Sequence, residues 1–147
     1  MKKRTPITLL SLLLLITFII PAPSKAQAAQ QPIKIRMFDE YIYTDVEPII
    51  RDDRVLVPIR FIAENFNYDV EWKEDTQTVI LSKPGRLLAM RIGENNVQDG
   101  SWAMYETDTV PIIYKDRTMV PVRFVSEWMG LKVDWDNNTR TVIIDSW

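Results

Sequence analysis

The chain has 147 residues, with 18 lysines and arginines against 20 aspartates and glutamates, and it contains neither cysteine nor histidine. Without cysteine there are no disulfides, no thiolate metal sites and no lipid-modified N-terminal cysteine. Without histidine the chain lacks the usual imidazole base and the commonest metal ligand. The composition therefore predicts a protein with no cofactor and no metal site.

The first 28 residues have the pattern of a signal peptide. Lys2–Arg4 form a basic start, Ile7–Ile20 carry no charge, and Ala26–Ala28 supply an A-x-A cleavage pattern. The uncharged stretch is shorter than the about 20 residues that cross a bilayer, which favours a cleaved leader over an uncleaved anchor. We predict that residues 1–28 are removed and that the protein is secreted, either extracellular or associated with the cell wall.

Removal of this leader changes the charge of the protein. The leader holds four of the 18 basic residues and no acidic one, so residues 29–147 carry 14 basic against 20 acidic side chains. A protein of this charge without a basic run is repelled by nucleic acid and by anionic lipid. We therefore expect neither nucleic acid nor, after cleavage, a membrane as a partner.

Ahead of position 46, apolar and polar residues alternate in Ile33–Met37, and the short segment Tyr41–Tyr43 follows after a turn. This pattern predicts a hairpin. The apolar run Pro48–Ile50 then leads through a polar turn to a short strand at Val55–Val57. Pro58 comes next, and proline suits the first turn of a helix because its missing N–H has no partner there in any case.

A helix is predicted over Ile59–Phe66, where the apolar residues fall mostly on one face. Asn67 stands at its end, a position at which a left-handed residue commonly stops a helix. Polar and apolar residues alternate in Asp69–Trp72, and Thr78–Leu81 is rich in β-branched residues. These two segments predict a second hairpin.

The segment 46–83 occurs a second time. Residues 109–146 align with it without a gap at an offset of 63, and 16 of the 38 positions are identical. We interpret this as a duplication, with one unit over residues 29–84 and another over residues 85–147. Because a unit of this size buries little surface alone, we expect the two to pack together or share a sheet.

The second copy predicts the same order of elements. Its hairpins are expected at Leu87–Ile92 with Trp102–Met104 and at Lys132–Trp135 with Thr141–Ile144, and Gly130 stands at the end of its helix. The predicted fold is therefore α+β: two repeated units of β-hairpin, short strand, short helix and β-hairpin, packed together around antiparallel sheet.

The cores of the two copies carry a specific motif. They read D-R-V-L-V-P-I-R-F-I-A-E at residues 53–64 and D-R-T-M-V-P-V-R-F-V-S-E at residues 116–127, and each continues into V-x-W and T-x-T-V. The V-x-W tryptophans, Trp72 and Trp135, are assigned to the core. The pattern resembles two tandem copies of the motif of the copper amine oxidase N-terminal domain family, also called the stalk domain.

This resemblance implies an α+β module found in exported bacterial proteins. It does not imply amine oxidation. In the amine oxidases the copper and the quinone cofactor belong to a separate catalytic domain that needs histidine ligands, and this chain has no histidine.

Each predicted helix carries an arginine and a glutamate four residues apart, Arg60 with Glu64 and Arg123 with Glu127. We interpret these residues as part of the structural motif, tying the helix to its neighbours. The alternative is a small hydrolase that uses the glutamates on envelope polymers. A lone carboxylate in each unit lacks the acid–base partner that hydrolysis needs, which favours the structural interpretation.

The turns of the later hairpins are rich in oxygen ligands, with Glu71, Glu74 and Asp75 in the first copy and Asp134 and Asp136 in the second. Such a group of side chains is a candidate calcium site. No D-x-D-x-D-G loop is present, however, and aspartate and asparagine are ordinary turn formers. We therefore predict solvated turns.

Two aromatic residues mark a difference between the copies. Trp128 and Tyr114 stand where the first copy has asparagine and arginine, so both positions are expected near the surface. Together with Trp102 and Tyr105 they form a candidate binding surface, suited to stacking on sugars or to a protein partner. The alternative for Trp128 is packing between the two units.

From these features we expect an exported, non-catalytic stalk-type module that acts in binding, spacing or protein interaction at the bacterial cell envelope. Its partner is expected to be a cell-wall glycan or an extracellular protein. Two alternatives stand beside this expectation: the carboxylate-dependent hydrolase, and a secreted inhibitor or accessory subunit of another enzyme.

Overall fold

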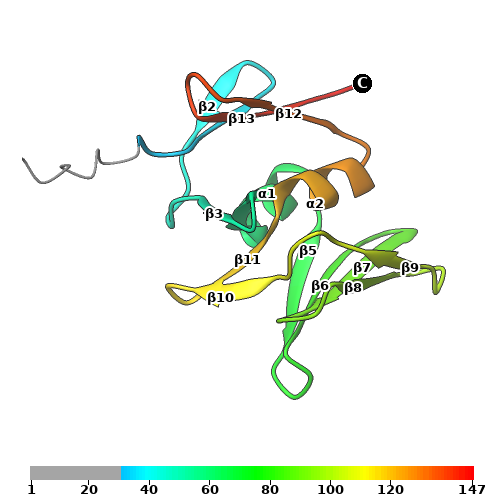
Figure 1. Ribbon diagram of the computed structural model, residues 1–147. Helices are drawn as coiled ribbons and strands as arrows, with labels where there is room; N and C mark the ends of the chain where they lie inside the picture. The colour runs from blue at the N-terminus through cyan, green and yellow to red at the C-terminus, as the bar shows by residue number, and fades with distance from the viewer. Residues whose placement is uncertain (1–30) are drawn as a thin grey trace, which may run out of the picture. The chain divides into compact units, whose positions relative to one another are not determined.

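The computed structural model describes residues 31–147, and Gln31–Trp147 form one compact unit. The predicted signal peptide, residues 1–28, lies outside the described residues. Within the described part the fold is a mixed α+β arrangement of three sheets and two short helices (Figure 1). No helix in this part is both long enough and apolar enough to cross a membrane.

The central sheet joins two antiparallel hairpins in the strand order β10-β11-β4-β3. Val57 of β4 faces Val120 of β11, and the two residues are 63 positions apart. On either side of this pair, Pro58 faces Met119 and Pro121 faces Leu56, so the pairing is symmetric about the two valines. The strands are β3 (Ile49–Arg51), β4 (Arg54–Pro58), β10 (Ile112–Tyr114) and β11 (Arg117–Pro121).

The two hairpins of the central sheet turn through two residues each. Asp52 and Asp53 have φ values of 50° and 57°, and Lys115 and Asp116 have 47° and 59°. Two successive residues in the left-handed region form a type I′ turn, whose twist matches that of the flanking strands. Aspartate tolerates this region because its short side chain bonds to the nearby backbone.

Each helix begins directly after a central strand. α1 (Ile59–Asn65) follows Pro58 and α2 (Val122–Trp128) follows Pro121. The fixed φ of proline suits a helix start, where its missing N–H leaves no bond unmade. The predicted helix ends are confirmed, since Asn67 has a φ of 55° and Gly130 a φ of 90°.

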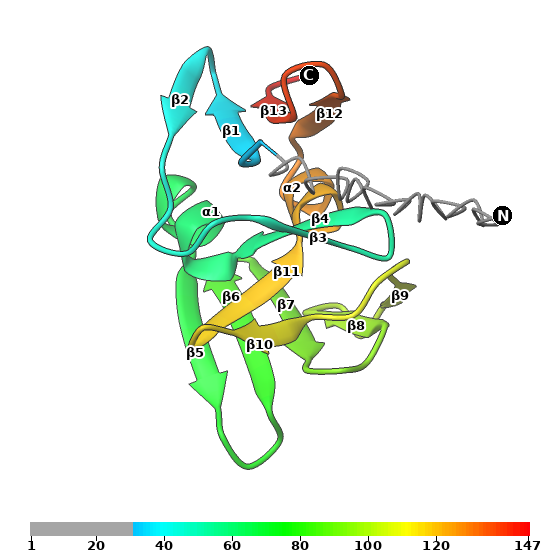
Figure 2. The ribbon, with the colours of Figure 1, turned by 60° about the vertical axis from the view of Figure 1, so that its left-hand side comes forward.

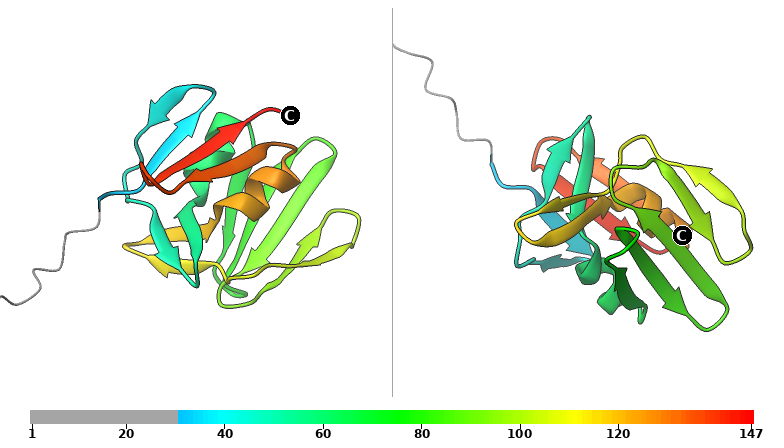
Figure 3. Two further views of the ribbon diagram at one scale, coloured as in Figure 1. Left: turned by 45° about the horizontal axis from the view of Figure 1, so that its top comes forward. Right: turned by 90° about the horizontal axis from the view of Figure 1, so that it is seen from below.

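The terminal sheet has the order β12-β13-β1-β2 and joins the two ends of the described chain. β1 pairs with β13 in parallel, with Ile35 opposite Val142 and Met37 opposite Ile144 (Figure 3). The expected antiparallel arrangement is wrong at this pair, because no tight turn connects the two strands or sets their direction. The strands are β1 (Lys34–Met37), β2 (Glu40–Ile42), β12 (Lys132–Asp136) and β13 (Thr141–Asp145).

The five-stranded sheet runs from β5 to β9 in chain order, with every neighbouring pair antiparallel. It contains strands at the positions expected from Asp69–Trp72, Thr78–Leu81 and Leu87–Ile92. The expected pairing of Leu87–Ile92 with Trp102–Met104 is wrong, because β8 lies between β7 and β9 and Trp102 lies in the turn before β9. The sequence does not indicate β8 because asparagine, glutamine and aspartate are poor strand formers. Val97 is the buried residue of β8. The strands are β5 (Asp69–Lys73), β6 (Thr78–Lys83), β7 (Arg86–Arg91), β8 (Asn96–Asp99) and β9 (Met104–Glu106).

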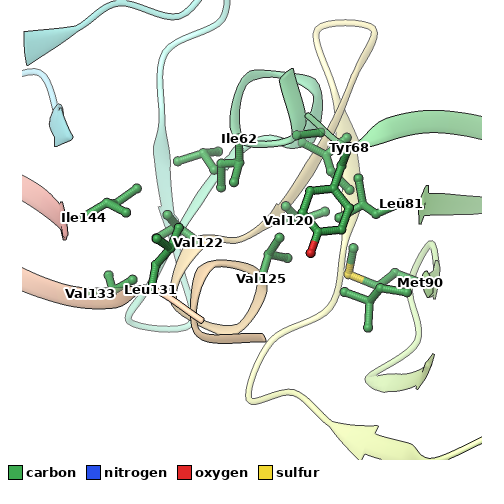
Figure 4. Close-up of a cluster of buried hydrophobic side chains, with 14 of the residues drawn as sticks. Ile62, Tyr68, Leu81, Met90, Val120, Val122, Val125, Leu131, Val133 and Ile144 are labelled. Atoms are coloured by element: carbon green, nitrogen blue, oxygen red, sulfur yellow. The ribbon is translucent and has the colours of Figure 1, made fainter. Parts of the chain in front are cut away.

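The main core lies around the two helices, which Figures 1 and 2 place between the terminal sheet and the five-stranded sheet. Figure 4 shows Ile62 and Val125 of the helices packed among Leu81 and Met90 on one side and Ile144 on the other. Burying an aliphatic side chain of this size is worth roughly 1.5–3 kcal/mol. In a chain without cysteine, this core and the sheets must supply the stability.

A smaller cluster lies on the opposite face of the central sheet. Leu56 and Met119 alternate with Val57 and Val120 along their strands, so their side chains point away from the main core. Both are fully buried, and Val46 covers them. The central sheet is therefore buried on both faces at its middle.

One buried hydroxyl gives a test of this packing. Ser126 is fully buried on α2, its Oγ has no hydrogen-bond partner among residues 31–147, and α1 has Ala63 at the same place. An unpaired buried hydroxyl costs roughly 1–3 kcal/mol. Ser126→Ala is expected to raise the free energy of unfolding by about 1 kcal/mol, measured by urea denaturation.

Thr107→Val is the matched control. The buried Thr107 Oγ1 donates a 2.8 Å hydrogen bond to the carbonyl oxygen of Thr109, and valine removes this donor at nearly constant volume. This change is expected to lower the free energy of unfolding by about 1 kcal/mol. A Ser126→Ala variant that loses stability in the same way contradicts the account of an unpaired hydroxyl.

Candidate functional site

The hairpin of β8 and β9, residues 96–106, exposes several large apolar side chains. Trp102 in its turn is 81% exposed, and Met104 and Tyr105 on β9 are 62% and 40% exposed. β9 is an outer strand of the five-stranded sheet, so one of its edges has no neighbour within that sheet. We call this element the Trp102 hairpin.

The carboxylate of Asp99 braces the turn of the Trp102 hairpin. Its Oδ1 accepts hydrogen bonds from the backbone N–H groups of Ser101 (2.9 Å) and Ala103 (3.0 Å) and from Ser101 Oγ (2.7 Å). Its Oδ2 accepts one from the hydroxyl of Tyr105 (3.0 Å). These bonds, that of the Ser101 hydroxyl foremost, hold the pKa of Asp99 below its ordinary value.

This bracing holds Trp102 in an unusual backbone conformation. Its φ is 68°, in the left-handed region that costs a residue other than glycine roughly 1–2 kcal/mol. The hydrogen bonds of Asp99 on both sides of Trp102 offset that cost. The exposed indole therefore projects from a turn with a defined shape rather than from a loose loop.

The other two aromatic residues of the candidate binding surface are half-buried. The ring of Trp128 lies 5.7 Å from that of Tyr68, and the guanidinium of Arg86 lies 4.4 Å above its face. Trp128 thus links the end of α2 to β7 and to the residue before β5. Tyr114 packs against the small cluster on the central sheet.

Trp72 is more exposed than the sequence predicts. It is 37% exposed, and its Nε1 donates a 2.5 Å hydrogen bond to Oε2 of Glu74, whereas Trp135 packs against the main core. The assignment of Trp72 to the core is therefore wrong. Both tryptophans lie on outer strands, but the buried side chains of the main core pack against Trp135 and not against Trp72, which opens onto a groove.

This groove has a volume of about 840 Å³ and runs between α1, the strands β5 and β6, and the hairpin of β10 and β11. We call it the Trp72 groove. A second groove of about 560 Å³ contains Trp135, and we call it the Trp135 groove. Many of their lining residues lie 63 positions apart, among them Arg60 and Arg123, Val70 and Val133, Trp72 and Trp135, and Val79 and Val142.

Two ion pairs border these grooves. Arg117 Nε lies 2.6 Å from Asp45 Oδ2, and Arg54 Nε lies 2.7 Å from Asp108 Oδ2. The two aspartates are 63 positions apart, as are the two arginines. One pair joins an aspartate of the first part of the chain to an arginine of the second, and the other joins an arginine of the first part to an aspartate of the second. The bond from Arg117 lowers the pKa of Asp45. Exposed pairs of this kind stabilise little and act mainly by fixing position.

The arginine and glutamate positions of the two helices differ. Arg123 Nη1 lies 3.5 Å from Glu127 Oε1, an ion pair within α2 rather than one that ties the helix to a neighbour. Among residues 31–147 neither Arg60 nor Glu64 has an oppositely charged group within 4.0 Å. Both of them instead line the Trp72 groove.

Comparison with known protein families identifies the family of this domain. The family model for the copper amine oxidase N-terminal domain matches residues 36–144. The chain belongs to the copper amine oxidase N-terminal domain family. In copper amine oxidases, the domain that gives the family its name is the non-catalytic N-terminal module.

A curated relative of this N-terminal domain comes from Brevibacillus choshinensis, where it is named "Protease inhibitor". The two chains are 30% identical over 90 residues, which is 60% of this chain and 27% of the relative. The chain thus matches about a quarter of the length of that protein.

Three carboxyl groups of the domain lack the raised pKa of a catalytic acid. Hydrogen bonds lower the pKa of Asp45, Asp99 and Asp136. A general acid needs the opposite shift, produced by burial or by a second carboxylate. Glu74, in the Trp72 groove, has both oxygens in hydrogen bonds, with Trp72 and Gln77.

The oxygen-rich turn of the last hairpin is ordered by its own side chain. Asp136 Oδ1 accepts hydrogen bonds from the backbone N–H of Asn138 (2.9 Å), and Oδ2 accepts one from Thr139 Oγ1 (2.7 Å). These bonds, that of the Thr139 hydroxyl foremost, lower the pKa of Asp136. No group of three or more acidic side chains close enough to hold a metal ion occurs within residues 31–147.

Sequence reasoning named Trp102 and Tyr105 but missed Asp99 and the groove around Trp72. The segment Asp99-Gly100-Ser101 is a turn pattern that could have indicated the brace. Glycine is favoured at position 100, since a Cβ there would lie in a tight contact, 3.2 Å from Cβ of Leu87. The groove has no local pattern, because its walls come from segments far apart in the chain.

The lowered pKa of Asp99 predicts a transition of the hairpin in acid. The bracing is fully present above the ordinary value of 3.8 and is lost as the pH falls through the lower value in the folded protein, because protonation removes the accepting charge. The amide signals of Ser101 and Ala103 in NMR spectra are expected to move together on acidification below pH 3.8.

Asp99→Ala provides the control for this titration. In that variant both amide signals should start at their unbraced positions and show no transition. Amides that do not respond to acid in the original protein, or that respond equally in the variant, contradict the role given to Asp99.

Proposed function

We propose that this domain is an exported, non-catalytic module that binds an extracellular protein at or near the bacterial cell envelope. The observation that carries the proposal is the braced Trp102 hairpin. Export is inferred from the leader pattern in residues 1–28. We also infer that residues 29–84 and 85–147 are two copies of one unit, as the shared order of elements and the matching grooves suggest.

The hairpin has the properties of a protein-binding anchor. Interfaces are enriched in tryptophan, tyrosine and methionine, and the three exposed residues of the hairpin are of these types. An aromatic side chain already held in place binds more tightly, because less entropy is lost when it docks. The free edge of β9 adds backbone groups that a strand of the partner can pair with.

A protein partner suits the hairpin better than a glycan. Trp102 projects from the apex of a turn and is 81% exposed, so it fits into a pocket of a partner. A sugar chain, in contrast, suits a concave site lined by aromatic side chains. The cell-wall glycan remains an outcome of the binding experiment below.

A second candidate function is the inhibition of an extracellular protease, which the name of the Brevibacillus choshinensis relative favours. The φ of 68° at Trp102 differs from the extended backbone of a β-strand. We therefore expect inhibition by obstruction of the protease rather than by presentation of the turn as an extended, cleavable segment.

The binding function predicts retention of the protein by a secreted partner. In a pull-down from culture supernatant and from purified cell wall, Trp102→Ala is expected to weaken retention by about 2 kcal/mol, or roughly 30-fold in Kd. Trp147→Ala is the matched control, because Trp147 is 84% exposed and lies outside the hairpin. Retention by neither fraction, or equal loss in both variants, contradicts the proposal.

The inhibition function predicts a dose-dependent loss of activity when the protein is added to secreted proteases. Trp102→Ala is expected to abolish this effect and Trp147→Ala to preserve it, and the turn at Ser101 should stay uncut in mass spectra. Full protease activity at saturating protein removes inhibition as a function and leaves the binding proposal to its own test.

A further inference from the structure

The two grooves share part of their apolar lining and differ in polar side chains, which we call the rim. Valine and tryptophan side chains line both grooves. At the rim, Glu74 of the Trp72 groove stands where the Trp135 groove has Asn137, and Gln77 stands where it has Arg140. Both differences make the Trp72 groove the more negative of the two.

The charged side chains that line the two grooves show the same difference in net charge. In the Trp135 groove, three aspartates face three arginines. In the Trp72 groove four carboxylates face only the two arginines Arg60 and Arg117, and Arg117 already holds Asp45. The Trp72 groove therefore carries a surplus of negative charge, supplied by Glu64, Glu74 and Asp116.

Aromatic faces lie within the same groove. Trp72 is 37% exposed, and the bond from its Nε1 to Glu74 fixes the orientation of the indole ring. Tyr43 is 92% exposed and Phe61 is half-buried, and both also line the groove. A cation above the face of such a ring is attracted by about 0.5–1 kcal/mol at an exposed site.

We propose that the Trp72 groove binds a basic, extended peptide segment of a protein partner. A lysine or arginine side chain lies against the Trp72 ring, and its charge is balanced by Glu64 and Asp116. The volume of about 840 Å³ suits a ligand of several residues. A neutral sugar chain leaves the surplus negative charge uncompensated, and an anionic one is repelled.

This inference goes beyond the function proposed for the hairpin. The Trp72 groove and the Trp102 hairpin share no residue. The Trp102→Ala variant is therefore expected to bind the basic peptide as the original protein does. Failure of the groove proposal leaves the pull-down results for the hairpin unaffected, and the reverse also holds.

The test is an NMR titration of the full chain with a blocked Gly-Lys-Gly-Lys-Gly peptide, followed at the indole N–H of Trp72. Saturable shifts that weaken with added salt are expected, and none with Gly-Glu-Gly-Glu-Gly. Glu64→Gln should raise the Kd roughly threefold to fivefold. Glu127→Gln, the same change 63 positions later and outside both grooves, should leave it unchanged.

An exchange of rims gives the sharper test. Glu74→Asn combined with Gln77→Arg gives the Trp72 groove the rim of the Trp135 groove and is expected to raise the Kd at least about tenfold. Unchanged thermal unfolding shows that the variant is folded, and Asn137→Glu with Arg140→Gln should create peptide shifts at Trp135.

Three results overturn the proposal. The first is a Kd that neither Glu64→Gln nor the rim exchange alters. The second is an equal response of Trp72 and Trp135 in the original protein. The third is a response of Trp72 to N-acetylglucosamine oligomers but not to the lysine peptide, which identifies the groove as a glycan site instead.

Discussion

The pairing of β4 with β11 is the contact on which the rest of the structure depends. Val57 and Val120 face each other there and are completely buried. Both strands end in a proline that begins a helix, so the strand pair also fixes where α1 and α2 start and which faces they bury. From the helices the chain continues into opposite sheets, α1 into the five-stranded sheet and α2 into the terminal sheet.

Local signals in the sequence were sufficient for the elements around this contact. Pro58 and Asn67 mark the start and end of α1 because proline fixes its own φ and asparagine tolerates the left-handed region, whatever surrounds them. The parallel pairing of β1 with β13 could not be predicted, since no turn links the strands. The exposure of Trp72 depends on what covers an outer strand, and the role of Asp99 depends on four donors whose positions only the folded turn defines.

The two parts of the chain use one frame for different surfaces. The strands, helices and reciprocal ion pairs of residues 46–83 have counterparts 63 positions later, and they account for most of the shared residues. Only the five-stranded sheet carries the braced hairpin, and only the Trp72 groove has the negative rim. The frame therefore carries two distinct candidate surfaces within residues 31–147.

The parallel pair of β1 and β13 also sets the order of events during synthesis. Lys34 bonds with residues near position 141, so the terminal sheet stays incomplete until the last strands of the domain have joined the first. Contacts between such distant residues slow folding, because a long loop must close before they form. A chain emerging N-terminus first therefore keeps β1 without its β13 partner until the last strand has been made.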